Sequence, residues 1–227
     1  MKKIEKGNHP YKTKLDYKKM EVIFRENNFS GYGFSKIKTS NDRFYWFKDN
    51  GGDILAVAHL DSVQKPTHFN VDDSENSDTI IFSPVLDDRL GAYLIVEYLQ
   101  NFNLKYDILL TTDEERGGST AMFFENNKQY NWGFEFDRKG DDVVNYQYSD
   151  TVFNNLLKGA GFIIGNGSYS DISELERLGC KFFNIGCGYY KYHSSDAYAS
   201  TNEIHAQVDR FVNFYKNNHN VFMPHPK

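Results

Sequence analysis

The chain has 227 residues, of which 40% are hydrophobic and 16% aromatic, enough apolar material for one sizeable α/β domain. Its formal net charge of -5 disfavours a nucleic-acid or anionic-membrane partner. No apolar run reaches transmembrane length, and the basic N-terminus lacks the apolar centre of a secretory signal. We therefore expect a cytoplasmic protein.

The predicted elements alternate between helices and strands. An amphipathic helix is expected over residues 11–27, then a meander of strands over 31–49 with a turn at 40–42. An Asn-Gly-Gly turn leads into an apolar strand at 54–58. Further helices are expected at 90–101, 119–126, 152–159, 172–178 and 202–218. This alternation predicts a mixed, centrally parallel β-sheet with helices on both faces, a three-layer α/β sandwich.

The segment ILAVAHLDS carries the first candidate site residues. Its apolar run is typical of a strand that is buried on both faces. The two-residue period of a strand puts His59 and Asp61 on one side, where the Asp61 carboxylate can bind the second ring nitrogen of His59. Such support is typical of a metal-binding imidazole. Taken alone, the pair is better explained by a capped strand end with a surface ion pair.

Two adjacent carboxylates, Asp87 and Asp88, follow the next apolar run. Like charges this close persist where a cation compensates them, and either Arg89 or a metal ion meets that need. A helix N-terminus that favours acidic residues explains the pair equally well.

Three more clusters follow later strands. The strand at 107–111 leads to Glu114 and Glu115, whose side chains point to different sides, so one can bind a metal while the other acts as a general base. Asp137 and His193 end two further strands. Each cluster alone has a simpler explanation: the glutamate pair as a helix cap, Asp137 as part of a surface ion pair, and His193 as a histidine without a special role. These explanations do not account for the order in which all the clusters occur at strand ends. In an open α/β sheet, ligands bind at that edge.

In this order the segments AHLDS, LDDRLG, TDEERGG, FEFDRKG and YYKYHSSD resemble the co-catalytic zinc peptidases. That superfamily includes aminopeptidases, peptidase T-like tripeptidases and glutamate carboxypeptidases. The resemblance spans residues 54–198, and it implies two Zn²⁺ ions per chain, with Co²⁺ or Mn²⁺ as substitutes. Imidazole and carboxylate ligands suit zinc.

The resemblance also implies a role for each matched residue. Glu114 becomes the general base, and Asp61 takes a supporting position in the catalytic site. The five implied metal ligands form two sites that share one bridging carboxylate: His59 and Asp137 in the first, Glu115 and His193 in the second, and Asp87 in both.

Relatives commonly insert a lid or dimerisation domain, and neither gap here is long enough for one. Residues 64–83 are expected to form a polar loop or small hairpin, and 137–193 hold ordinary sheet and helix elements. We therefore expect a single catalytic domain over residues 1–227, without a lid or dimerisation insert. The oligomeric state is not indicated.

The predicted function is a metal-dependent hydrolase of peptide or related amide bonds, most simply an aminopeptidase-like exopeptidase acting on a peptide or small amide. An acidic cleft favours a free α-amino group, whereas a carboxypeptidase needs a cation for the substrate carboxylate. Charge does not decide between an aminopeptidase and a carboxypeptidase, because four cations lie near the site in sequence: Arg89, Arg116, Arg138 and Lys191. Two alternatives remain open: a di-zinc deacylase or amidohydrolase of a small acylated compound, and a non-catalytic metal- or peptide-binding module, against which the paired glutamates argue.

Three tyrosines and two cysteines lie shortly before His193 in the chain. Tyr189, Tyr190 and Tyr192 precede His193, and either pack or donate to an oxyanion. Cys180 and Cys187 lie so close to one predicted strand that reduced core residues are expected rather than a disulfide.

Overall fold

The computed structural model describes residues 13–39, 42–73 and 78–226. At its centre is an eight-stranded sheet in the order β1-β2-β6-β3-β7-β10-β8-β9. β6, β3, β7 and β10 run parallel, and antiparallel pairs flank them on both sides. The predicted mixed, centrally parallel sheet is confirmed. Its strands are β1 (Ser35–Lys38), β2 (Phe44–Lys48), β3 (Ile54–His59), β6 (Asp107–Thr111), β7 (Trp132–Arg138), β8 (Asp142–Val144), β9 (Ile163–Ile164) and β10 (Phe182–Gly186).

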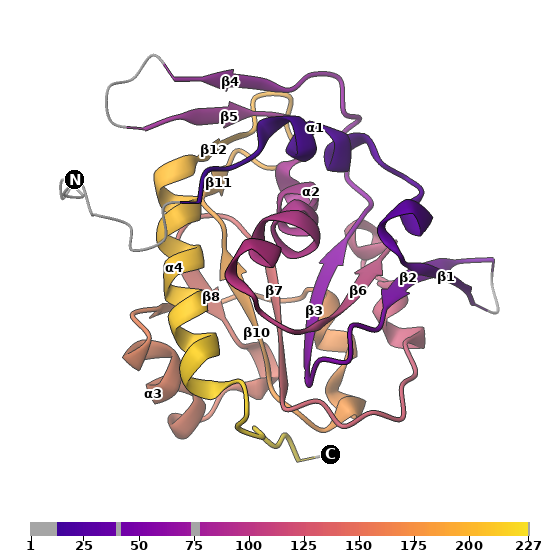
Figure 1. Ribbon diagram of the computed structural model, residues 1–227, viewed down its shortest axis with the longest axis vertical. Helices are drawn as coiled ribbons and strands as arrows, with labels where there is room; N and C mark the ends of the chain where they lie inside the picture. The colour runs from indigo at the N-terminus through magenta and orange to yellow at the C-terminus, as the bar shows by residue number, and fades with distance from the viewer. Residues whose placement is uncertain (1–12, 40–41, 74–77, 227) are drawn as a thin grey trace.

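The α-helices cover one face of this sheet (Figure 1). α2 (Leu86–Tyr93) packs on β3 and β7, and α1 (Tyr17–Arg25) packs on α2. α4 (Thr201–Asn218) presents Phe211 to Phe134 and Phe136 of β7, and α3 (Thr151–Gly159) presents Phe153 to β10. Each such buried aromatic contributes about 1.5–3 kcal/mol.

The opposite face is covered by short 3₁₀ helices. In β7, Glu135 points away from Phe211 and toward Ser170, which precedes one of these helices. The predicted three layers are thus present, with α-helices in one outer layer and 3₁₀ helices in the other: Thr120–Phe123, Tyr146–Tyr148, Asp171–Glu174 and Glu176–Leu178.

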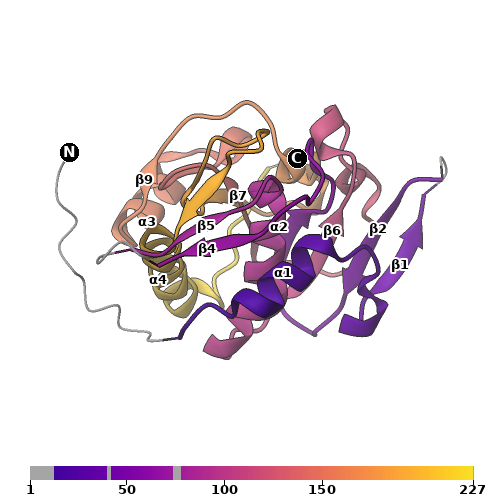
Figure 2. The same ribbon diagram turned by 90° about the horizontal axis from the view of Figure 1, so that it is seen from above.

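A second, four-stranded antiparallel sheet lies beyond the carboxyl ends of the central strands (Figures 1 and 2). It is formed by β4 (Asn70–Asp72), β5 (Ile80–Phe82), β11 (Tyr189–Tyr190) and β12 (Tyr198–Ser200). β4 and β5 form the hairpin expected within 64–83, and residues 74–77 between them lie outside the described residues. This sheet matters for the site because the loop from β11 to β12 carries His193.

Strand β3 fits the expected double-sided burial, because all six of its residues are buried between β6 and β7. α2 lies close against this part of the sheet. A side chain on Gly91 would collide with the backbone of Phe136 and with Asp88, so only glycine allows the approach. Asp87 and Asp88 have non-helical backbone angles, and regular helix starts after them, near the expected residue 90. The helix continues as a π-helix (Leu94–Tyr98) and a 3₁₀ turn (Leu99–Phe102).

The predicted helix at 119–126 is wrong, because the structure has only a four-residue 3₁₀ helix there. The Ser119 hydroxyl accepts the Ala121 N–H, and the Arg177 guanidinium binds the carbonyls of Ala121 and Phe124. These contacts occupy groups that a longer helix would use. The helix predicted at 172–178 likewise forms two 3₁₀ turns.

The first helix begins at Tyr17 rather than residue 11, because the Asp16 carboxylate caps the N–H groups of Lys18 and Lys19. Residues 11–12 of the predicted helix and 40–41 of the predicted turn lie outside the described residues. In the part of the chain that the structure describes, none of the helices has both the length and the hydrophobicity to cross a membrane.

Candidate metal centre

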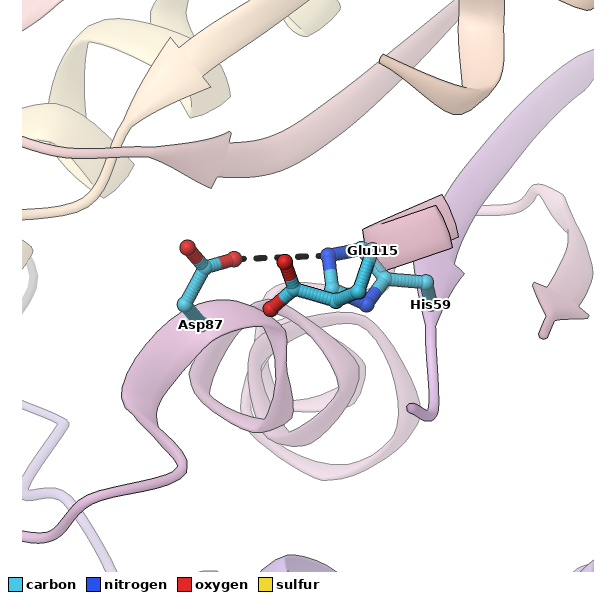
Figure 3. Close-up of side chains that lie close together, drawn as sticks. All are labelled: His59, Asp87 and Glu115. Atoms are coloured by element: carbon cyan, nitrogen blue, oxygen red, sulfur yellow. Dashed lines mark ion pairs between the residues drawn. The ribbon is translucent and has the colours of Figure 1, made fainter. Parts of the chain in front are cut away.

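The five predicted metal-binding side chains meet at the carboxyl edge of the central sheet. They come from separate elements: His59 ends β3, Asp137 lies near the end of β7, and Asp87 stands at the start of α2. Glu115 belongs to the 3₁₀ turn Glu114–Arg116 after β6, and His193 to the loop between β11 and β12. Figure 3 shows His59, Asp87 and Glu115 pointing toward one another from three of these elements.

The first half of the centre surrounds Nε2 of His59. This atom lies 3.3 Å from Oδ1 of Asp87 and 3.5 Å from Oδ1 of Asp137. The His59 side chain is fully buried, and that of Asp137 is 7% exposed. Three side chains thus converge on one small buried volume.

The second half surrounds Nε2 of His193. This atom lies 3.2 Å from Oδ2 of Asp87 and 2.9 Å from Oε2 of Glu115. Asp87 therefore offers one oxygen to each half, which is the arrangement of a bridging carboxylate. The His193 side chain is 39% exposed, so this half is open to solvent.

The residues fit a metal pair by two independent observations. Zinc bonds of about 2.0–2.1 Å in a tetrahedron put ligand atoms about 3.3 Å apart, close to the separations in both halves. Nε2 of His59 is buried and makes no hydrogen bond to any residue that the structure describes, although three carboxylates face it. A buried nitrogen without a hydrogen bond is costly unless it binds something else. Two groups have ligand atoms all within 4.8 Å of one another: His59, Asp87 and Glu115; and His59, Asp88 and Asp137.

The electrostatics favour positive charge at this point. Burial alone lowers the pKa of His59, but the carboxylates of Asp137 and Asp87 raise it well above its usual value. Burial raises the pKa of Asp137 well above its usual value, and the neighbouring Asp87 adds to the shift. The site therefore lacks cationic charge, which a divalent metal ion supplies.

Asp88 differs from its neighbour Asp87. It is fully buried, and its Oδ1 accepts the N–H of Gly91 at 3.0 Å, which fixes the start of α2. Burial raises its pKa well above the usual value, with Asp137 contributing next. Among the described residues its Oδ2 has no hydrogen-bond partner, and one of its carboxylate oxygens lies within 4.8 Å of ligand atoms of His59 and Asp137.

Asp61 lies beside His59 but contacts it differently from the expectation. The His59 Nδ1 lies 2.9 Å from the backbone carbonyl oxygen of Asp61 and 3.6 Å from its carboxylate. The carbonyl therefore orients the ring. The carboxylate instead accepts the N–H groups of Glu114 and Glu115 at 3.3 and 3.2 Å. Asp61 thus connects His59, at the end of β3, to the turn that carries Glu114 and Glu115.

Glu114 lies at the edge of the first half. Its Oε2 is 3.9 Å from Nε2 of His59, and its side chain is 14% exposed. Burial raises its pKa to about 7, so in this environment the carboxylate can both accept and release a proton near neutral pH. Its position beside the centre suits a group that handles the proton of a water molecule.

Two buried acids lie behind the centre. Asp171 follows the helix cap Ser170 and accepts hydrogen bonds from Thr111 and Ser119. Glu135 is fully buried, and among the described residues neither of its carboxylate oxygens has a hydrogen-bond partner. The alternation of FEFD put Glu135 on the same face as Asp137, so a signal existed in the sequence.

A cleft of about 430 Å³ opens onto the centre. The OH of Tyr189 lies 3.4 Å from Oδ1 of Asp137, while Tyr190 turns away and donates to Glu203. Tyr192 packs edge-on against the His193 ring. The lining residues that sequence reasoning missed are Tyr146, Asn166, Gly167, Ser168, Tyr169 and Lys139.

The four cations considered as carboxylate binders have different surroundings. Arg89 is buried and donates to the carbonyls of Ile23 and Glu26. The Arg116 side chain is 85% exposed and lies 3.9 Å from Asp113, and Lys191 lines neighbouring pockets. Only Arg138 lines the cleft. Cys180 and Cys187 are buried and unpaired, as expected.

No protein-family model matches the sequence, and no curated protein matches it. Solved structures match in shape. Aminopeptidase PepT of Bacillus cereus has a TM-score of 0.61 and 9% identity, over 88% of this chain and 98% of that one. A tripeptidase of Staphylococcus aureus has a TM-score of 0.60 and 9% identity, and the match covers 89% of this chain and 98% of that one. A TET aminopeptidase of a marine-sediment thaumarchaeon has a TM-score of 0.56 and 10% identity, and the match covers 86% of this chain and 96% of that one. At such identities the likeness shows the fold, and at that level the predicted resemblance is confirmed.

Proposed function

We propose that the protein is a metal-dependent hydrolase of peptide bonds, an aminopeptidase-like exopeptidase with two metal ions. The observation that carries this proposal is Asp87, whose two oxygens face His59 on one side and His193 on the other. A single-metal site or a structural ion does not need that arrangement. The fold shared with the aminopeptidases of Bacillus cereus and the marine archaeon supports it.

Five side chains would hold the metal pair: His59, Asp87 and Asp137 in one half, and Asp87, Glu115 and His193 in the other. When bound there, the metal ions would lower the pKa of a water molecule and supply positive charge for the developing oxyanion. We name zinc because each half offers one imidazole and two carboxylates, and three protein ligands that leave a fourth position open are typical of catalytic zinc.

The protein's own groups handle the protons. Glu114 accepts a proton from the attacking water and returns it to the leaving amine, and the burial that raises its pKa favours holding that proton between the two steps. Asp61 holds Glu114 and Glu115 in place through their backbone N–H groups. The carbonyl of Asp61 keeps the proton of His59 on Nδ1, which leaves Nε2 free to bind a metal.

The acidic end of the cleft favours a substrate with a free α-amino group. Four carboxylates line it: Asp87, Glu114, Glu115 and Asp137. The metal ions would neutralise the three carboxylates that bind them, but Glu114 is not a ligand, and its charge attracts an ammonium group. We therefore propose that the substrate binds with its N-terminal residue at this end.

The Glu114→Gln variant tests the mechanism. It keeps the size and shape of the side chain but removes the base, so kcat on a dipeptide should fall by about 10²–10⁴-fold. Zinc content by elemental mass spectrometry should stay unchanged, because Glu114 is not among the five ligands. Glu21→Gln, on the exposed face of α1, is the matched control and should keep full activity.

Full hydrolysis by Glu114→Gln would contradict the proposed role of Glu114. A panel of aminoacyl, dipeptide and N-acyl substrates separates the proposal from its alternatives. Hydrolysis of N-acyl compounds alone would favour a deacylase, and binding of peptides without any cleavage would favour a binding module.

A further inference from the structure

The cleft is lined by side chains of both charges. Four carboxylates belong to the metal end, and two cations, Arg138 and Lys139, follow Asp137 in the chain and line the cleft as well. The two cations differ in their surroundings. The Arg138 guanidinium is held by both oxygens of Asp142 and by the carbonyl of Asn166, so its charge is already compensated.

Lys139 is the uncompensated cation of the cleft. Over the described parts of the chain, no carboxylate lies within ion-pair distance of its Nζ, which instead stands 4.8 Å from the centroid of the Tyr192 ring. Lys139 is exposed and lines the cleft, so its ammonium group is available to a ligand. Tyr192 is 38% exposed as well, and its ring supports the lysine without neutralising it.

Lys139 is close to the reacting centre. Tyr192 links the two, because its ring contacts the Lys139 ammonium on one side and the His193 ring, at 4.6 Å between centroids, on the other. Two residues of extended peptide span about 7 Å. Lys139 is therefore within reach of the next one or two residues of a peptide that is cleaved beside His193.

We propose that Lys139 is a specificity-determining residue that binds a carboxylate of the substrate on the leaving-group side of the scissile bond. This inference rests on the proposed function and deepens it. The substrate class is a short peptide, with its ammonium at the acidic end of the cleft and a carboxylate one or two residues away at Lys139. The carboxylate belongs either to the C-terminus of the peptide or to an acidic side chain.

The test compares three substrates with the zinc-loaded protein: Ala-Ala, Ala-Ala amide and Ala-Asp amide. A charge-assisted contact predicts that the KM for Ala-Ala is about tenfold lower than for its amide. Ala-Asp amide identifies the source, because a low KM for it means that an acidic side chain serves as well as the C-terminus. A high KM for it means that the C-terminus is required.

Lys139→Met keeps the length of the side chain and removes its charge. It should reduce the ratio of the two KM values to about one, and kcat should change much less. Lys36→Met is the matched control, because Lys36 also stands over an aromatic ring, 3.6 Å from the centroid of Phe44, but outside the cleft. It should keep the tenfold ratio. Equal KM values in the wild-type protein, or a ratio that survives in Lys139→Met, would overturn the inference.

Calorimetry separates this inference from the proposed function. If no substrate is hydrolysed, the proposed function fails, and binding of Ala-Ala and Ala-Ala amide is then measured directly. Tighter binding of the free acid that disappears in Lys139→Met would keep the role of Lys139. Equal binding of both compounds would overturn it.

Discussion

The two halves of the metal centre share Asp87 but differ in how they are built. His59 and Asp137 stand on neighbouring parallel strands and are almost completely buried. His193 and Glu115 stand on a loop and a 3₁₀ turn, and His193 is 39% exposed with a left-handed backbone at φ 61°. The first half is fixed by the sheet, and the second depends on local turns. We expect them to respond differently to substitution.

The largest difference is expected between His59→Ala and His193→Ala in the metal-free protein. Removing buried His59 leaves the carboxylates of Asp87 and Asp137 without their cationic partner, which should cost about 3–5 kcal/mol of unfolding free energy. Removing the half-exposed His193 should cost about 1 kcal/mol or less, because solvent screens its ion pairs. Denaturant titration in the presence of chelator measures both. Equal losses would show that the two halves are built alike.

A smaller effect is expected from the turn that carries Glu114 and Glu115. The Arg43 side chain holds this turn from outside, donating to Asp113 at 2.8 Å and to the carbonyl of Gly118. Arg43→Ala should loosen Glu115 and weaken zinc binding in the second half by about 10–100-fold, with the first half unchanged. Competition with a chromophoric chelator measures this.

Arg116→Ala is the matched control for the turn. Arg116 also pairs with Asp113, but at 3.9 Å and with 85% of its side chain exposed. Its removal should leave both zinc affinities unchanged. If Arg43→Ala has as little effect, the turn is held by its own backbone and by Asp61, and the contrast between the two halves becomes smaller.

The contrast between the half fixed by the sheet and the half that depends on turns also explains which parts of the site could be predicted from the sequence. The apolar strand ending in His59 and the alternating strand ending in Asp137 have strong periodic patterns, and both form where they were expected. Buried strands specify their register through every side chain, so the residue at the strand end is specified too.

The remaining features depend on contacts between distant segments. The backbone carbonyl of Asp61, not its carboxylate, binds His59, and no residue pattern encodes that choice. Residues 119–126 have a helical pattern, but Arg177, more than fifty positions away, binds the carbonyls of Ala121 and Phe124. The place of Lys139 depends on the Tyr192 ring, which the loop between β11 and β12 brings across the cleft. Tertiary contacts of this kind override local propensity.

The central claim is that one carboxylate, Asp87, joins two metal sites. The most direct test is the zinc content of the wild-type protein and of Asp87→Asn, measured by elemental mass spectrometry after equilibrium dialysis. The wild type should hold about two zinc ions per chain, and Asp87→Asn should lose most zinc from both sites, since each loses an anionic ligand. Asp196→Asn, an exposed residue near His193, should keep two. A wild-type protein with no zinc, or an Asp87→Asn variant that keeps two, would contradict the account.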